Sequence, residues 1–161
     1  MTTYNAGWNS NEWFIVSMLI AGFAAVVFLP KRFPLYQTIL FSVIGFFFVV
    51  VVDHSISIPP FDYYDVNDSN KYEFTDTLSY LMFGPFGYLF LYVFDRLGRP
   101  YRHFPLYVLG WGISGLILEK IAVLLEVFHY KNGYRHDFST FVYISLQCVL
   151  IAFYRFIRAV G

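Results

Sequence analysis

Five long runs of apolar residues constrain this chain more than any other feature of its sequence. A helix needs about 20 mostly apolar residues to cross a hydrocarbon core about 30 Å thick. Each run comes close to that length, and runs that are apolar on every side are typical of buried or lipid-facing helices. The runs cover residues 13–29, 35–52, 77–94, 105–128 and 138–157.

The composition supports a membrane protein. Of the 161 residues, 58% are hydrophobic and only 14% are charged, whereas soluble domains average about 45–50% apolar and about 25% charged residues. We therefore predict an all-α fold, a bundle of five transmembrane helices forming a single membrane domain over residues 1–161, with the lipid bilayer as its partner. The formal net charge is zero, so we expect no nucleic-acid binding.

The loops predict an orientation. Lys and Arg concentrate on the cytoplasmic side of membrane proteins, and here one side of the predicted bundle carries seven of them against three on the other. This places the N-terminus outside and the C-terminus inside, with residues 53–75 as an outer loop. Aromatic residues near the span ends, including Tyr80 and Tyr130, fit interfacial belts.

Glu119 is the most informative polar residue. It lies within the fourth run, about nine residues from the predicted outer end, or roughly 13 Å along a helix axis. Glu126 and His129 follow at helical spacing and would complete one polar stripe, with Gln147 on the fifth run as the expected partner of Glu119. The stripe has two interpretations: a path for protons or cations, or a polar clamp that fixes helix packing.

Asp53 and His54 close the second run at the predicted outer face. A carboxylate beside an imidazole can orient it for acid–base or metal chemistry, but adjacent side chains diverge on a regular helix. A solvated end of a span is the alternative.

The acidic outer loop partly follows a calcium-loop pattern, with oxygen ligands at positions 1, 3, 5 and 12. It departs from that pattern because position 6 is Asn70 rather than Gly. The alternative is a solvated loop with a helix cap, and we expect no metal and no cofactor. The candidate ligands would be Asp65, Asn67, Ser69 and Asp76.

Small residues in the fourth run predict close helix packing. Gly110 and Ser114 have the spacing at which small side chains let two membrane helices approach each other.

Several segments together resemble a family of small, uncharacterised multi-pass membrane proteins from spore-forming Gram-positive bacteria. The resemblance covers most of the chain from about Leu29 onward, although the family usually has Trp where Tyr134 stands. It implies a five-helix protein of the bacterial cytoplasmic membrane and no particular activity. The segments that carry it are Lys31-Arg32, residues 74–78, Pro85, residues 92–95, Trp111, Glu119 and residues 130–134.

Three classes of function remain open at this point. The first is a structural or partner-binding subunit in the bacterial cell membrane, as a homo-oligomer or with a larger membrane protein. The second is a component of a transporter or channel for protons, cations or a small solute, using Glu119. The third is a membrane-embedded enzyme acting at the outer face, and an enzyme is the least favoured of these.

Overall fold

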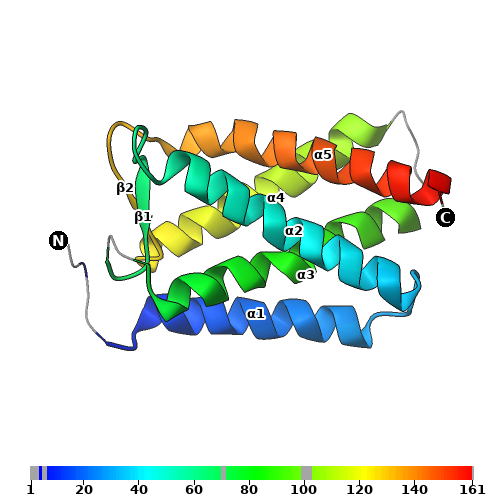
Figure 1. The fold of residues 1–161 in the computed structure, drawn as a ribbon, viewed down its shortest axis with the longest axis horizontal. Coiled ribbons are helices and arrows are strands. Elements are labelled where there is room, and N and C mark those ends of the chain that lie inside the picture. Colours follow the sequence, from blue (N-terminus) through cyan, green and yellow to red (C-terminus); the bar gives the residue numbers. More distant parts are fainter. Residues whose placement is uncertain (1–3, 5–6, 70–71, 99–102, 161) are drawn as a thin grey trace.

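The computed structural model describes residues 4, 7–69, 72–98 and 103–160. In this part of the chain, five long helices form a bundle (Figure 1), and all five are long and apolar enough to cross a membrane. The predicted all-α bundle is thereby confirmed. The helices are α1 (Ser10–Phe28), α2 (Leu35–Ile56), α3 (Phe74–Arg96), α4 (Phe104–Leu124) and α5 (Ser139–Val160).

A two-stranded ribbon closes one end of the bundle. Strand β1 (Tyr64–Val66) pairs antiparallel with β2 (Phe128–Tyr130), and the short helix η2 (His136–Phe138) follows before α5. We call this the cap end, and the other the opposite end. The N-terminus lies at the cap end and the C-terminus at the opposite end (Figure 1).

Capping residues set where two helices begin at the cap end. The Asn9 side chain accepts a hydrogen bond from the Asn11 backbone, and Glu12 accepts one from the Asn9 backbone at 2.7 Å. Glu73 and Asp76 form the equivalent capping box of α3. Such caps satisfy the N–H groups that the first turn of a helix leaves without partners.

Glycines bring α1, α2 and α3 close together. A Cβ atom on Gly87 of α3 would lie 2.8 Å from the Cα of Gly45 on α2, and one on Gly22 of α1 would lie 3.0 Å from Pro85. The contact predicted at Gly110 is wrong for the described part of the chain, because a Cβ there would meet none of its atoms within 4 Å. The close approach in this bundle is between α2 and α3 instead.

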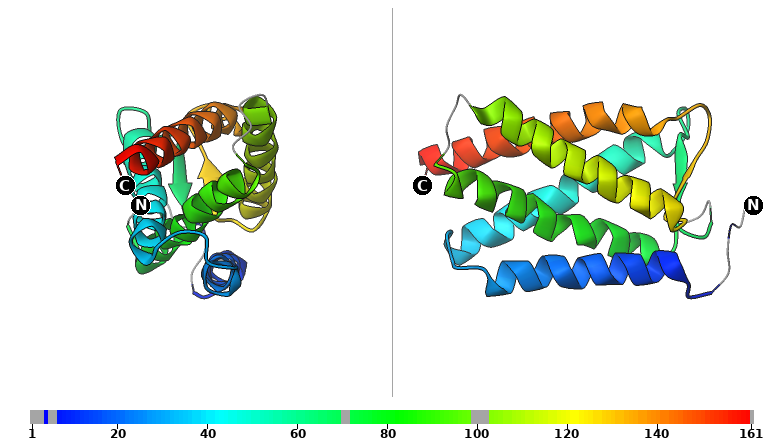
Figure 2. Two further views of the ribbon diagram at one scale, coloured as in Figure 1. Left: turned by 90° about the vertical axis from the view of Figure 1, so that its right-hand side faces the viewer. Right: turned by 180° about the vertical axis from the view of Figure 1, so that it is seen from behind.

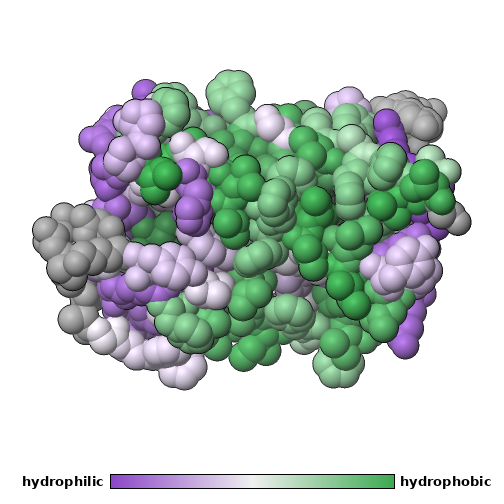
Figure 3. Space-filling view, viewed as in Figure 1, coloured by the Kyte–Doolittle hydropathy of each residue, from purple (hydrophilic) through white to green (hydrophobic). Residues whose placement is uncertain are grey.

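Seen along its length, the bundle has α2, α3, α4 and α5 around its axis and α1 outside α3 (Figure 2). Aromatic side chains fill the half of the bundle near the opposite end, among them Phe41, Tyr88, Phe90 and Tyr154. The visible surface is hydrophobic along the middle and hydrophilic at both ends (Figure 3). This banded surface is compatible with a multi-pass membrane protein.

Candidate functional site: a carboxylate cavity beneath the cap

The polar stripe predicted along one helix is wrong, because α4 ends at Leu124. Glu126 lies beyond that end with a φ of 63°, which turns the chain out of the helix. His129 lies in β2, where its ring stacks on Tyr4 with the centroids 3.7 Å apart. Glu119 is therefore about 7.5 Å from the end of its helix rather than about 13 Å.

Glu119 is buried, with 7% of its surface exposed. Its Oε1 accepts hydrogen bonds of 2.5 Å from the hydroxyls of Tyr130 and Ser139, and the Nδ1 of His136 lies 3.8 Å from the same oxygen. Tyr143 is also in hydrogen-bonding contact with this carboxylate, whereas Oε2 is buried and no described residue makes a hydrogen bond of ordinary length to it. Donors from β2 and α5 thus hold one oxygen of this α4 carboxylate, and the other oxygen has no comparable hydrogen bond among the described residues.

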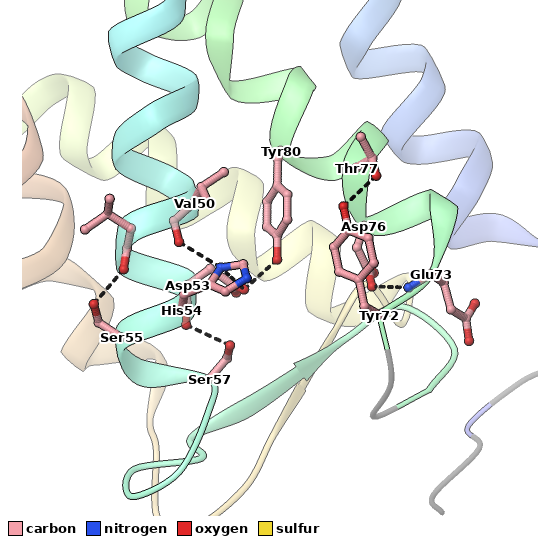
Figure 4. A network of polar contacts seen from close by, with 11 residues as sticks. Val50, Asp53, His54, Ser55, Ser57, Tyr72, Glu73, Asp76, Thr77 and Tyr80 are labelled. Atoms are coloured by element: carbon pink, nitrogen blue, oxygen red, sulfur yellow. Dashed lines mark hydrogen bonds and ion pairs between the residues drawn. The ribbon is translucent and has the colours of Figure 1, made fainter.

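Asp53 is the second carboxylate of the site and lies near the end of α2. Its Oδ2 accepts a hydrogen bond of 2.6 Å from the hydroxyl of Tyr80 on α3 (Figure 4). The neighbouring His54 has a half-exposed side chain, whose Nδ1 lies 3.0 Å from the carbonyl oxygen of Val50 and 3.8 Å from Asp53. The expected pair is therefore divided: Asp53 is buried, and His54 faces outward.

Glu119 and Asp53 line the same cavity, which lies beneath the ribbon. Its volume is about 80 Å³, enough for several water molecules. The walls come from α2, α3, α4 and α5, and the roof from both strands. Among the described residues that line it, none is Lys or Arg.

Tyrosines surround both carboxylates. The ring of Tyr134 lies 5.2 Å from that of Tyr130 and 5.8 Å from that of Tyr64. Burial raises the pKa of Tyr64, as do the charge and hydrogen bonding of Asp53. Burial likewise raises the pKa of Tyr130, together with its hydrogen bond to Glu119. These hydroxyls therefore stay protonated at neutral pH and can donate to the carboxylates.

The tyrosines are the part of the site that sequence reasoning missed. Tyr80 and Tyr130 were expected in an interfacial belt, where amphipathic rings gather at the membrane surface. Both instead donate to buried carboxylates. A tyrosine near the end of a span can serve an interfacial belt or donate to a buried carboxylate. Its position in the sequence is the same for both roles, so the sequence alone does not separate them.

Gln147 does not pair with Glu119. Its amide lies against the backbone of α4, and the orientation that satisfies both of its polar atoms donates to the carbonyl oxygen of Val108 at 2.8 Å and accepts from the N–H of Gly112 at 3.2 Å. A buried amide needs both kinds of partner, and the helix backbone beside Gly112 supplies them. The predicted link between α4 and α5 exists, but it runs to the backbone.

The residues of the predicted calcium loop are engaged with other groups. Asp65 accepts a hydrogen bond of 2.6 Å from Lys131, and Asn67 donates to Asp76 at 2.6 Å. Ser69 donates to Glu73 at 2.5 Å. Within the described ranges no three His, Cys, Asp or Glu side chains are placed to hold a metal ion, and Asn70 lies outside those ranges.

Charge is divided between the two ends. Every acidic residue of the chain except Asp95 lies in the elements and loops of the cap end. Asp95, at the opposite end, is held by an ion pair with Arg32 and by the hydroxyl of Tyr154. Arg32 also donates to the backbone carbonyl of Asp95 at 3.0 Å. This carboxylate was not singled out from the sequence.

Comparison with family models, with curated proteins and with solved structures found no match to this chain.

Proposed function

We propose that this chain is an integral protein of the cell membrane that binds a cation in the cavity at its cap end. The observation that carries the proposal is the Oε2 of Glu119, which is buried and receives no hydrogen bond of ordinary length from the described residues, in a side chain that lines the cavity. An unsatisfied buried polar group costs about 1–3 kcal/mol, and a charged one more. A bound cation or a proton removes that cost.

The sign of the charge supports the same proposal. The cavity has two carboxylates, Asp53 and Glu119, and no basic residue among its described lining residues. The surrounding cap end carries nearly all the acidic residues. A surface of one sign raises the local concentration of ions of the opposite sign and speeds their association.

The distribution of Lys and Arg supports an outward-facing cap end. Lys31, Arg32, Arg96, Arg155 and Arg158 all lie at the opposite end, and such residues favour the cytoplasmic side. Arg99 and Arg102, which also entered the prediction, lie outside the described residues, as does Lys71. The resemblance to membrane proteins of spore-forming bacteria supports a bacterial cytoplasmic membrane.

The geometry favours cation binding over the other two classes. A carboxylate that served only as a packing clamp would have both oxygens paired, as Asp95 shows by contrast. An enzyme using Asp53 with His54 would need the imidazole in the cavity, whereas the His54 side chain is 52% exposed. Association with a larger membrane protein or with a second copy stays a prediction.

The test is thermal unfolding of the full chain in detergent. The Tm would be measured against the concentration of sodium, potassium, calcium and ammonium chlorides at constant ionic strength, and against pH. We expect at least one cation to raise the Tm of the wild type and to lose that effect in Glu119→Gln and Asp53→Asn. Glu126→Gln is the matched control, because Glu126 is an exposed carboxylate at the same end that does not line the cavity.

The proposal is wrong if every cation acts equally on the wild type and on both cavity variants. A separate measurement extends the function: flux of protons or cations into proteoliposomes loaded with a pH-sensitive dye. Flux that depends on Glu119 would make the binding site part of a transport cycle. Binding without flux would make the protein a receptor or a regulated subunit.

A further inference from the structure

We infer that the cation is a small organic ammonium ion, held against Asp53 and Glu119 by the tyrosine rings around them. This inference rests on the proposed function, and it names the class of ligand that the cavity selects. Three observations carry it: the aromatic lining, the way the carboxylates are already bonded, and the position of the cavity in the bundle.

The lining is aromatic to a degree that an inorganic ion does not require. Five tyrosines contribute to it, together with Phe83 and Phe128. The face of an aromatic ring attracts a cation within about 6 Å of its centroid, and cages of such rings recognise alkylated ammonium groups. The tyrosines are Tyr64, Tyr80, Tyr130, Tyr134 and Tyr143.

The carboxylates are bonded in a way that suits a diffuse charge better than a metal ion. Calcium takes six to eight oxygen ligands and magnesium about six in a tight octahedron. Here Glu119 shares its Oε1 with two hydroxyl donors, and Asp53 receives the Tyr80 hydroxyl. In the part of the chain that the structure describes, no group of three metal-binding side chains is present. An ammonium ion needs only a nearby carboxylate and apolar contacts for its methyl or methylene groups.

The position of the cavity allows two sources for such an ion. It lies beneath the ribbon, within the last turns of α2 and α4, at the level where a membrane meets water. A free amine from solution and the ammonium of a lipid head group share the chemistry that the site recognises. The experiment therefore has an arm for each.

The probes are choline chloride, potassium chloride and the uncharged alcohol 3,3-dimethyl-1-butanol, which has the shape of choline without its charge. Each would be titrated into the full chain in detergent by calorimetry at constant ionic strength. We expect choline to bind, and both other probes to bind at least about tenfold more weakly, a difference of about 1.4 kcal/mol.

Paired variants separate the ring from the hydroxyl. Tyr64→Phe keeps the aromatic face, and Tyr64→Leu removes it. We expect the choline affinity to change by less than about 3-fold in the Phe variant and to fall about 5- to 30-fold in the Leu variant, the range of one cation–π contact. The Tyr134→Phe and Tyr134→Leu pair repeats the test should Tyr64→Leu fail to fold.

The source is decided in nanodiscs of phosphatidylglycerol with or without phosphatidylethanolamine. A lipid ammonium in the cavity raises the Tm in the discs that contain ethanolamine and weakens choline binding there, whereas a free amine as ligand leaves both unchanged. This arm decides only the source of the ammonium, and the calorimetry with choline decides whether an ammonium ion is the ligand.

The inference and the proposed function fail differently. If potassium binds in a manner that depends on Glu119 while choline does not compete, the ligand class is wrong and the cation site stands. Equal binding of choline and the uncharged alcohol also overturns the ligand class, because recognition is then of shape alone. If no cation of either kind acts through Glu119, both proposals fall.

Discussion

The two ends of the bundle bury a carboxylate in opposite ways. At the opposite end, Asp95 has a cationic partner in Arg32 and a hydroxyl donor in Tyr154. At the cap end, Glu119 accepts hydrogen bonds from two hydroxyls on Oε1, with His136 3.8 Å from the same oxygen, and receives none of ordinary length on Oε2 from the described residues. The first carboxylate has a charged partner within the protein, whereas the second has a buried acceptor without an ordinary hydrogen bond in a residue that lines the cavity.

This difference separates a structural carboxylate from one available to a ligand. Removing one partner of a buried ion pair leaves an uncompensated charge, so a completed pair resists change. An incomplete site gains free energy when something binds to it. Burial alone would not distinguish the two residues, because Asp95 is 6% exposed and Glu119 is 7% exposed.

The largest expected effect comes from removing the ion pair between Asp95 and Arg32 at the opposite end. Asp95→Asn removes the charge that faces Arg32 and should lower the free energy of unfolding by about 2–4 kcal/mol, somewhat below the usual cost of a broken buried pair because Arg32 is 39% exposed. Unfolding in mixed detergent micelles, followed by circular dichroism, measures it. A loss below about 0.5 kcal/mol would show that the pair at this end is not a structural one.

The next effect compares a tightly packed glycine on α3 with an open one on α4. Gly87→Ala places a Cβ 2.8 Å from the Cα of Gly45 and should cost about 1–3 kcal/mol, because two helix backbones must separate. Gly110→Ala is the matched control, because no atom of the described residues lies within 4 Å of its added Cβ. The same unfolding assay applies, and equal costs for the two would mean that α2 and α3 are not locked together.

A smaller effect than that of Asp95→Asn is expected at the cap end. Glu119→Gln removes a buried charge without losing an ion pair to Lys or Arg, so stability without ligand should stay within about 1 kcal/mol of the wild type or increase. The readout is the Tm in the absence of added cations. A loss as large as that of Asp95→Asn would remove the contrast between the two ends.

The smallest effect concerns the ribbon over the cavity. Desolvation opposes ionisation of Lys131, but its hydrogen bonds to Asp62 and Asp65 outweigh this and raise its pKa. A raised pKa in the folded state means that the stabilisation is fully present below the unfolded pKa and is lost as the pH rises through the folded value. Lys131→Gln should therefore lower stability by about 0.5–1 kcal/mol at neutral pH.

The pH dependence of this difference shows whether Lys131 itself carries the effect. The difference in Tm between wild type and Lys131→Gln should be constant from pH 6 to about pH 9 and should close only above about pH 10.4, where an unfolded lysine loses its proton. A difference that already closes near pH 7 would mean that another group carries the effect.

The sequence predicts the helices of this protein well because apolar length is a strong local signal. All five spans were placed, and the boundary errors lie where the chain turns. The fourth was extended to residue 128 because Leu125, Val127 and Phe128 continue the apolar run. The conformation of Glu126 ends the helix there, and a single residue with positive φ leaves little trace in an apolar pattern.

The site was predictable in part. Glu119 and Asp53 could be named because a carboxylate inside or beside an apolar run is rare. Their tyrosine partners could not, because Tyr130 and Ser139 reach Glu119 across 11 and 20 residues and through a ribbon. Contacts between distant segments depend on how the helices are arranged, and helical spacing carries no information about that arrangement.

The ribbon also has a consequence for how the protein is made. Its two strands are far apart in the sequence where they are opposed, from Tyr64 to Tyr130, so the first strand waits for its partner until the fourth helix has left the ribosome. The earlier helices can pack against one another before that point. The roof of the cavity, and the hydroxyl of Ser139 at the start of α5, can be added only after α4 has been made.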